Sequence, residues 1–469
     1  MANSIMNVGV SGLQAAQVAL MTTGHNISNA MTPGYNRQQA IQSTNTPLPH
    51  SNGFIGRGVH ISTVQRVYSQ FLVNQSLQAQ TQSSQLSSYY SEIKQIDNLL
   101  ADTTSGLTPA LHNFFNAVQD VATNPASIPS RQAMLSNAEA LVSRFQQMDQ
   151  RLSEMREGVN SQITSTVTEI NSLAQQIAGL NVNIQAVEAS ANGQTANDLH
   201  DQRDMLIRNL SQLTNVDVVR QNNGHYNVFI GNGQSLVVGS SAMTLKAVAS
   251  PNDPQRLTVA MNLNDTEVLL PEHQLQGGSL GGLLAFRSET LDSVQNSFDQ
   301  LAWGIADTFN DQHQAGLDLQ GDTGVAFFAI ADSDHAARSI SVAISDPAKI
   351  AAAGSVLVDG ASSSGVADNR NALLLAELQT KNTLQDGTAS YQSAYASLVS
   401  QVGNKTRELE VTSKAQESML NQTDRTLQSL SGVNLEEEAA NLIRYQRMFQ
   451  ASSKVIEIGN SLFDSLLAI

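Results

Sequence analysis

Residues 130–189 read SRQAMLSNAEALVSRFQQMDQRLSEMREGVNSQITSTVTEINSLAQQIAGLNVNIQAVEA. Mostly apolar side chains recur here in steps of three and four, which places them along one face of an α-helix. They are Leu141, Phe145, Met148, Leu152, Met155, Val159, Ile163, Thr166, Ile170, Leu173, Ile177, Leu180, Ile184 and Val187. Such a helix would extend roughly 90 Å at 1.5 Å per residue. Because no compact core can surround it, we expect it to lie along other long helices.

The N-terminal segment also has a helical seven-residue repeat. Its large members are Met6, Leu13, Leu20 and Ile27. Three residues after each of these come the small members, which are Gly9, Ala16, Thr23 and Ala30. Small side chains allow a partner helix to approach closely, so this seam is expected to pack against another helix. The turn pair Pro33-Gly34 ends the pattern.

The C-terminal segment has a matching repeat. Its large members are Leu435, Leu442, Phe449, Ile456 and Phe463. The positions four residues later are mostly small or polar. Asn434 is suited to cap the helix, and Glu436 to Glu438 fall in its first turn, where the helix dipole favours negative charge. We therefore expect the two terminal helices to pack against each other and against neighbouring copies.

Other parts of the chain alternate between helical and strand-like patterns. Further helices are expected from about Val67 to Leu100, over 198–213, over 280–309, and from 371 to 430 with a break around Gly387. Residues 41–62 contain repeated Pro and Gly and are expected to form an extended connection.

The helical period changes to a period of two at about residue 215. Short apolar runs at 216–219, 226–230 and 236–238 are separated by the pairs Asn223-Gly224 and Asn232-Gly233. Asn-Gly between apolar runs is a strong hairpin signal, since both residues tolerate positive φ. The pattern predicts a small antiparallel β domain over 215–275.

These elements together predict a mainly α, multi-domain α+β chain with a nested order. Long coiled-coil-like helices would start from both termini, and the β domain would lie at the outer tip. The predicted divisions are terminal helices forming an inner tube domain, 1–40 with 431–469; a long-helix domain, 41–214 with 276–315 and 366–430; and an outer β domain, 215–275. Whether the partly β stretch 316–365 belongs to that outer domain stays open.

Composition excludes several classes of function. The net charge is −16 and no Lys/Arg cluster is present, which argues against binding nucleic acid or an anionic membrane surface. The absence of cysteine excludes disulfides, thiolate metal sites and a Cys nucleophile. No apolar run is long enough for a bilayer span, and the N-terminus lacks the features of a secretory signal peptide. A coiled-coil membrane receptor is therefore disfavoured.

Clusters of polar residues do not form a convincing catalytic, cofactor or metal site. The acidic residues around His200, namely Asp198, Asp201 and Asp204, point around a helix, so we interpret them as a solvated face rather than a metal site. The segment from Asp318 to Asp322 lacks the glycine and the closing glutamate of a calcium loop. We interpret Glu436 to Glu438 as capping residues.

Several motifs resemble the family of bacterial flagellar rod, hook and hook-associated proteins. The N-terminal signature is carried by GHNISNA at 24–30, TPGY at 32–35 and Arg37-Gln38. Its Gly-His-Asn start and Arg-Gln finish are most similar to members at the hook–filament junction. The segment NLEEEAANLIRYQ at 434–446 is similar to the C-terminus of the same members. The internal segments 198–210 and 277–284 are also similar to these members. Asn36 departs from the family, which commonly has Ser there.

The resemblance implies a ring of subunits between hook and filament, with the terminal helices forming the wall of the export channel. It implies export without a cleaved signal peptide through the flagellar type III apparatus, an extracellular location, and no cofactor. The implied partners are other copies of the chain, the hook protein, a second junction protein, the filament, and a chaperone on the C-terminal helix. His25 is interpreted as an interface or packing residue.

The predicted assembly interface combines the terminal seams with the motif. Its residues are Met6, Leu13, Leu20, Asn26, Ile27, Asn29, Pro33, Gly34, Tyr35, Leu435, Leu442, Phe449, Ile456 and Phe463. We also expect the terminal helices to be unfolded in the free subunit, because a helix with so many small seam positions gains little by folding alone.

Two alternatives remain at this stage. A hook or rod protein would share the N-terminal motif, although the very long helix and the motif details favour a junction protein. A wall-cutting enzyme attached to an axial protein would need two carboxylates flanking a cleft in an appended domain. No segment is left over for such a domain after the nested assignment.

Overall fold

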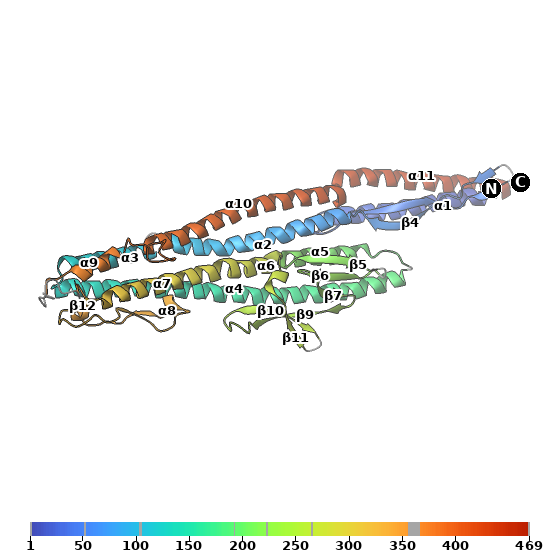
Figure 1. Ribbon diagram of the computed structural model, residues 1–469. Helices are drawn as coiled ribbons and strands as arrows, with labels where there is room; N and C mark the ends of the chain where they lie inside the picture. The colour runs from blue at the N-terminus through green and yellow to red at the C-terminus, as the bar shows by residue number, and fades with distance from the viewer. Residues whose placement is uncertain are drawn as a thin grey trace.

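The computed structural model describes residues 2–50, 53–102, 106–191, 193–221, 224–263, 266–354 and 366–467. Its α-helices are α1 (Ala2–Ser28), α2 (Gln70–Ala101), α3 (Leu107–Thr123), α4 (Ile128–Ser190), α5 (Asn197–Leu213), α6 (Gly278–Ala285), α7 (Asp292–Gln314), α8 (Ala336–Ser339), α9 (Arg370–Glu377), α10 (Tyr391–Ser431) and α11 (Leu435–Leu467). The helices form a long bundle with both termini at one end (Figure 1).

The strands are short and form separate small sheets. They are β1 (Gln38–Thr44), β2 (Leu48–His50), β3 (Gly53–Ile55), β4 (Val59–Arg66), β5 (Val216–Arg220), β6 (Tyr226–Ile230), β7 (Gln234–Val238), β8 (Ser241–Ala242), β9 (Thr244–Ala249), β10 (Leu257–Leu263), β11 (Thr266–Leu269), β12 (Gly316–Leu317), β13 (Phe328–Ile330), β14 (Ile340–Val342) and β15 (Ala353–Gly354). All the pairings are antiparallel. The mainly α fold class with an inserted β part is confirmed.

Helix α4 matches the predicted long helix, with 63 residues. Ser127 caps its first turn by accepting a hydrogen bond from the Ser130 amide, and Pro129 occupies a first-turn position where no intrahelical donor is needed. The apolar stripe is buried along nearly the whole helix, including Leu152, Ile163 and Ile177. This continuous burial explains why the periodicity over 141–187 identified the body of the helix.

Helices α2 and α10 run antiparallel to each other; α2 lies beside α6, and α10 contacts α7 (Figure 1). Ile93 and Ile96 of α2 are fully buried in the shared core. Polar pairs fix the alignment: the Ser76 hydroxyl lies 2.6 Å from Asp424 Oδ1 on α10, and Tyr89 Oη lies 2.8 Å from Thr290 Oγ1. The predicted helix over 280–309 is continuous from α6 to α7 through a π-helical turn at Phe286–Leu291.

The β part lies along the side of α4, not at the outer tip as predicted. The side chains of two asparagines of α4 hold it there by forming hydrogen bonds with backbone groups of the β part. Asn171 exchanges two 2.8 Å hydrogen bonds with the backbone of Leu245, and Asn181 donates to the carbonyl oxygens of Tyr226 and Gly239. Each sheet therefore covers its apolar face with the long helix instead of closing on itself.

The end of the bundle farthest from the termini contains an aromatic core. Its rings come from α3, α7 and the start of β13, with centroid separations from 4.9 to 6.1 Å. They belong to Phe114, Phe115, Phe309, Phe327 and Phe328, all of which are at most 1% exposed. Helix α3 was not predicted, because its short apolar period precedes the much stronger pattern of α4.

The remaining predictions differ in detail. The stretch predicted as an extended connection, 41–62, contributes to two paired sets of strands, since β1 pairs with β4 and β2 with β3. The predicted helix over 371–430 has its predicted break: α9 and α10 are separated by a segment with a left-handed turn at Gln385, Asp386 and Gly387. The stretch 316–365 forms the pairs β12–β15 and β13–β14, and its residues 355–365, like Asn223 of the first predicted turn, lie outside the described residues.

Candidate assembly site at the terminal helices

Helices α1 and α11 pack antiparallel along a seam of small residues. A Cβ added at Gly9 would lie 2.7 Å from Ile456 Cγ1, and one added at Gly12 would lie 2.7 Å from Ser452 Oγ. At the other end, a Cβ at Gly459 would lie 3.7 Å from Ile5 Cγ2. At Gly9 backbone atoms of Ile456 and Ser452 also lie within 3.3 Å of the added Cβ, so the helices approach too closely there for a side chain. At Gly12 the nearest atoms belong to the Ser452 side chain, which can move.

The buried face of α1 consists of the small positions of its repeat. Gly9, Ala16 and Thr23 are buried, together with Ala15 and Ala19. Among the residues predicted as the interface, Asn26 is also buried; Met6, Leu13, Leu20, Ile27, Asn29, Tyr35, Phe449 and Ile456 are half-buried; Pro33, Gly34, Leu435, Leu442 and Phe463 are exposed. The pair thus keeps most of its large apolar side chains in contact with solvent.

The pair also exposes apolar residues that the seven-residue repeat did not identify. On α1 these are Val8, Val10 and Met21, with 37, 40 and 62% exposure, and on α11 they are Ile443, Ile458 and Leu462, with 50, 50 and 46%. These residues lie beside the α1–α11 contact and not in it. Their exposure therefore becomes visible only once the two helices are placed against each other. Their exposure makes the outer surface of the pair far more apolar than a solvated helix face.

Asn26 closes the loop that joins α1 to β1. Its Nδ2 donates to the Gln38 carbonyl at 2.9 Å, and its Oδ1 accepts from the Gln38 amide at 2.9 Å and from the Tyr35 hydroxyl at 2.7 Å. The side chain is 1% exposed, so no water can replace these partners. Desolvation by burial, with Asp198 and Asp201 nearby, raises the pKa of Tyr35 and keeps its hydroxyl a donor.

His25, in the last turn of α1, packs against the same loop. Its ring stacks edge-on against Tyr35 at 5.6 Å, and its Nε2 lies 3.2 Å from Asp198 Oδ1 on α5. Asp198 Oδ1 also accepts from Gln38 Nε2 at 2.7 Å. These contacts hold the N-terminal motif against α5.

The interpretation of the acidic residues on α5 as a solvated face is wrong for Asp201 and Asp204, whereas Asp198 is exposed. Asp201 is 6% exposed and accepts from the Asn36 amide at 3.0 Å, from Asn36 Nδ2 at 2.6 Å and from Arg66 Nη1 at 2.6 Å. Arg66 also contacts Asp204 Oδ2 at 2.9 Å. The Arg66 guanidinium from β4 satisfies both carboxylates, which is why they can be buried. Asn36, which replaces the Ser that is common in the family motif, donates from its side-chain amide to Asp201.

His200, the remaining member of that group, belongs to a second buried network. Its Nε2 lies 2.8 Å from Glu188 Oε1 of α4, and its Nδ1 lies 2.9 Å from Arg203 Nη2. The Arg203 guanidinium lies 3.5 Å from the centre of the Tyr226 ring and is fully buried. Burial lowers the pKa of His200. The Arg203 guanidinium can only donate, so Nδ1 accepts from it, the ring is neutral, and Nε2 donates to Glu188. These polar residues join α4, α5 and the β part.

Arg37 connects the loop to the first turn of α11. Its guanidinium forms an ion pair with Glu437 and places Nε 2.9 Å from Glu438 Oε1, while its amide donates to the Ser431 carbonyl at 2.8 Å. Capping of α11 is performed by Asn434, whose Oδ1 accepts from the Glu436 amide at 3.0 Å. The capping interpretation is therefore wrong for Glu437 and Glu438, which bind Arg37 across the chain.

The loop from Asp318 to Asp322 binds a side chain of the protein. Lys349 Nζ lies 2.9 Å from Asp318 Oδ2, 3.0 Å from Gln320 Oε1 and 3.1 Å from Asp322 Oδ2. The ammonium group supplies the positive charge that these oxygens require, so the contacts are structural.

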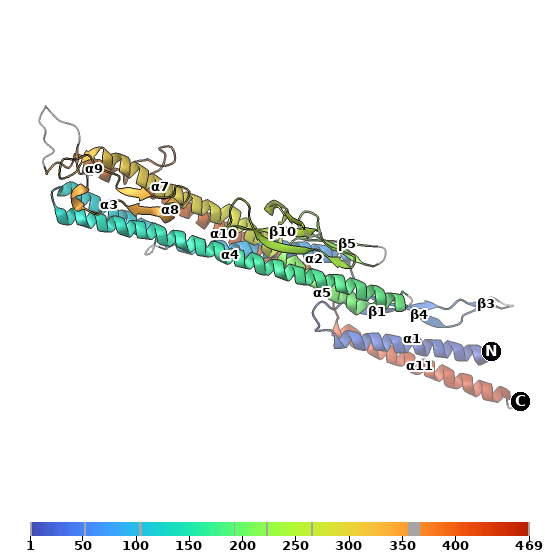
Figure 2. The ribbon, with the colours of Figure 1, turned by 90° about the horizontal axis from the view of Figure 1, so that it is seen from below.

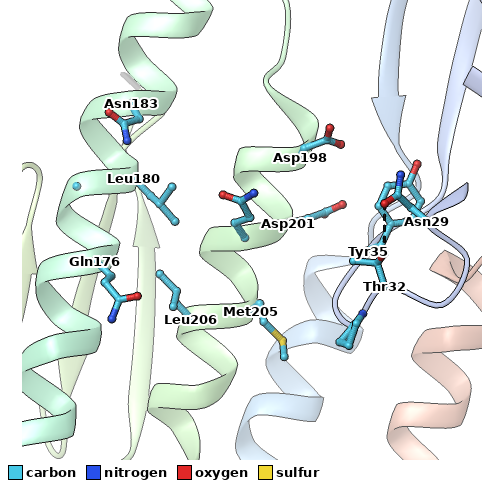
Figure 3. Close-up of a pocket in the computed structure, with 13 residues that line it drawn as sticks. Asn29, Thr32, Tyr35, Gln176, Leu180, Asn183, Asp198, Asp201, Met205 and Leu206 are labelled. Atoms are coloured by element: carbon cyan, nitrogen blue, oxygen red, sulfur yellow. Dashed lines mark hydrogen bonds between the residues drawn. The ribbon is translucent and has the colours of Figure 1, made fainter. Parts of the chain in front are cut away.

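An open groove lies between the N-terminal motif and the side of α4 and α5. It has a cavity volume of about 690 Å³. Figure 3 shows Leu180 and Leu206 facing each other between α4 and α5, with Asn29, Thr32 and Tyr35 on the opposite wall. Met205 of α5 extends toward the motif loop (Figure 3). The groove is continuous with the terminal pair through the motif itself.

Comparison with protein families places both ends and the middle of the chain in flagellar families. Residues 6–36 match the family described as flagella basal body rod protein, and residues 418–469 match flagellar basal body rod FlgEFG protein C-terminal. Residues 93–328 match flagellar hook-associated protein FlgK helical domain. Together with the nested terminal helices, these matches define a structural protein of the bacterial flagellum.

The particular family follows from relatives that align along the whole chain. Flagellar hook-associated protein 1 of Escherichia coli is 35% identical and that of Salmonella typhimurium is 36% identical, in each case covering 100% of both chains. A solved structure of the flagellar hook junction protein FlgK from Burkholderia pseudomallei is similar with a TM-score of 0.70 and 27% identity, covering 76% of this chain and 100% of that one. The chain belongs to the flagellar hook-associated protein 1 family.

Membership of this family settles two points about the protein. It is a structural component of the flagellum that interacts with the hook and other flagellar components, and it is not an enzyme. The wall-hydrolase alternative is therefore dropped. Among the helices of the described ranges, none combines the length and apolar composition of a membrane span. The E. coli alignment runs over 545 positions, more than the 469 residues here, so that relative carries insertions.

Proposed function

We propose that the chain joins hook to filament as a ring-forming subunit that assembles through the paired helices α1 and α11. The observation that carries this proposal is the pair itself, which has a close seam of small residues inside and large apolar side chains outside. Such an outer surface gains stability when neighbouring subunits cover it. Burying an exposed Ile or Phe side chain fully is worth about 1.5–3 kcal/mol.

The lack of charged residues on α1 also supports its burial against neighbouring subunits. No Asp, Glu, Lys or Arg occurs in residues 1–36, so covering α1 requires no ion to be desolvated. The other subunits, the hook protein, a second junction protein and the filament are the proposed partners. The predicted division into an inner tube part, a long-helix part and an outer β part is retained as a proposal, with 215–275 beside α4.

Export is the second part of the proposal. The subunit would leave the cell unfolded through the flagellar type III apparatus, with a chaperone holding its C-terminal helix, and would reside outside the cell on the flagellum. The absence of cysteine is compatible with passage into an oxidising environment, where a free thiol could form wrong disulfides.

A hook or rod subunit is the competing axial function, because both terminal matches are to rod families. The match of residues 93–328 to the hook-associated helical domain and the full-length relatives favour the junction.

A matched pair of surface substitutions tests assembly through the terminal pair. Ile458→Asp alters an exposed residue of α11, and Val219→Asp alters one of similar exposure, 53%, on β5. Each variant is expressed in cells that lack the natural gene. We expect both purified variants to melt like the wild type, whereas only Ile458→Asp gives bare hooks and releases both the subunit and flagellin into the medium. Normal filaments with Ile458→Asp would contradict assembly through this surface.

A further inference from the structure

A hairpin arm, described over 38–50 and 53–66 and called the 38–66 arm below, extends along the terminal pair (Figure 2). Its base is the β1–β4 pair, and its tip is the β2–β3 pair. Ser11 of α1 fixes the arm near the tip by donating its Oγ to the Val8 carbonyl and accepting from the Val59 amide at 3.2 Å. The arm therefore has a defined direction, with its tip toward the end where the termini lie.

The tip presents large apolar side chains that nothing in the described chain covers. Phe54 is 76% exposed, Leu48 is 51% exposed and Ile55 is 50% exposed. All three lie on the two short strands of the tip, which span only about three residues each. A patch this apolar on so small a hairpin is typical of a contact with another molecule.

The arm is also basic within an acidic protein. Residues 38–66 contain Arg57, Arg66 and two histidines but no Asp or Glu, whereas the whole chain has a net charge of −16. Arg66 is neutralised by Asp201 and Asp204, but Arg57 is exposed beside the tip. The tip thus combines apolar side chains with a positive charge.

The groove beside the N-terminal motif has the complementary character. Its walls contribute Pro33, Leu180 and Met205, and its rim contributes Asp198, whose side chain is 57% exposed. A cavity of about 690 Å³ is in the range that accommodates several side chains of a bound partner. The same chain therefore provides an apolar, basic tip and an apolar, acidic groove.

A copy cannot fill its own groove with its own arm. The arm begins at Gln38, whose Nε2 donates to Asp198 at the rim of the groove. Its tip lies ten residues further on, roughly 33 Å away at about 3.3 Å per residue. A contact between this tip and this groove would therefore join two different copies. Such a head-to-tail contact closes into a ring when the rotation between copies allows it.

We propose that the tip of the 38–66 arm of one subunit docks in the groove of a neighbouring copy of the same chain. Phe54, Leu48 and Ile55 would cover the apolar walls, and Arg57 would lie near Asp198. The proposal rests on the proposed assembly function and names one of its subunit contacts. It also assigns a role to exposed residues that the α1–α11 pair does not use.

Disulfide trapping tests this contact directly, since the chain has no natural cysteine. Phe54→Cys is combined with Gln202→Cys on the α5 wall in one variant, and with Asn183→Cys on the α4 wall in another. Isolated hook–filament complexes are treated with a mild oxidant and separated without reductant. We expect bonded dimers and higher multimers of the subunit from at least one pair, and none from the single variants.

An internal control reports whether oxidation succeeded. Gly12→Cys with Ser452→Cys should form a bond within one chain, because a Cβ at Gly12 lies 3.6 Å from Ser452 Cβ. Complete filaments in which this control bond forms but neither 54–202 nor 54–183 does would overturn the docking proposal while leaving the junction function intact. Bare hooks in the cysteine variants would be separated from this result by electron microscopy.

A substitution pair gives an independent readout. Phe54→Asp and Phe71→Asp change two phenylalanines of nearly equal exposure, 76 and 75%, one at the tip and one on α2. We expect Phe54→Asp to lose filaments under shear at least tenfold more readily than Phe71→Asp, with unchanged melting of the free subunit. Equal retention of filaments would overturn the proposal. Filament loss with Phe54→Asp but no disulfide would assign the tip to a different partner, and would also overturn it.

Discussion

Arg37 and Glu437 lie 400 residues apart in the chain and form a two-point ion pair, with Arg37 Nη2 2.7 Å from Glu437 Oε1 and Nη1 3.0 Å from Oε2. The same guanidinium meets Glu438, which is only 2% exposed. The two terminal motifs that define the family are thus one physical unit. Arg37 sets the position at which α11 begins relative to α1.

Removing Arg37 should loosen α11. Arg37→Met leaves the buried Glu438 carboxylate without its cation, and breaking a buried pair costs about 3–5 kcal/mol. Amide exchange in the first turns of α11 should accelerate accordingly, with little change in α4. Glu437→Gln is the control, because Glu437 is 52% exposed and an exposed pair contributes less than about 1 kcal/mol. Equal acceleration of exchange by the two substitutions would show that the Arg37–Glu438 contact does not stabilise α11 more than the exposed Arg37–Glu437 pair does.

The glycine seam makes a second prediction. Gly9→Val places a side chain where Ile456 and the Ser452 carbonyl already lie, so α1 and α11 must separate and assembly should fail. Gly459→Ala is the matched change on the opposite helix, where the added Cβ meets Ile5 at an ordinary 3.7 Å. It should assemble normally, and should favour helix by roughly 1 kcal/mol. Normal filaments with Gly9→Val would contradict the close antiparallel seam.

The terminal pair should open before the rest of the free subunit. Its seam buries mainly Gly, Ala and Thr, so it contributes little apolar burial compared with the bundle core. Amides at Leu13 and Leu442 should exchange much faster than those at Ile170 and Leu283, which are buried in the core. Equal protection at all four positions would show that the pair is a stable part of the monomer.

Acid should destabilise the outer end of the bundle through His313. Its ring is fully buried, with Nδ1 2.6 Å from the Val325 carbonyl oxygen and Nε2 2.9 Å from the Ala351 amide nitrogen, so it is a neutral ring that donates at Nδ1. Burial lowers its pKa to about 4. The unfolded state takes up this proton near pH 6.5, so the stabilisation is present above that pH and about 3 kcal/mol is lost as pH falls toward 4.

Urea unfolding of the wild type and of His313→Asn at pH 7.5, 5.5 and 4 measures this contribution. The stability difference between the two proteins should shrink as the pH falls, because only the wild type loses the His313 term. Comparing the two proteins at each pH cancels the other titrating groups. A difference that stays constant from pH 7.5 to 4 would contradict the assignment of a depressed pKa to His313.

The long and regular elements could be predicted from the sequence because their packing follows one periodic face. Helix α4 is the clearest case, since a partner covers its stripe along almost its whole length. The strands β5 and β6 were also located correctly, because short apolar runs separated by turn residues are a local signal, and burial alternates along β6. Their place beside α4 could not be predicted, since it depends on Asn171 and Asn181, which resemble ordinary exposed polar residues in the sequence.

The candidate site was only partly visible in the sequence. The repeats identified which helices pair, and the small members of the α1 repeat are the buried ones. The burial of Asp201 and Glu438 was missed, because each depends on an arginine far away in the chain, Arg66 for the first and Arg37 for the second. The basic arm with Phe54 at its tip has one signal in the sequence, the absence of any acidic residue over 38–66.

The most direct test of the junction function is deletion of the gene, followed by electron microscopy of the cells and an assay for flagellin in the medium. We predict complete hooks without filaments and flagellin released into the medium, because the filament would have no platform on which to grow. Cells without hooks would reassign the chain to the rod or hook. Normal filaments would contradict the central claim.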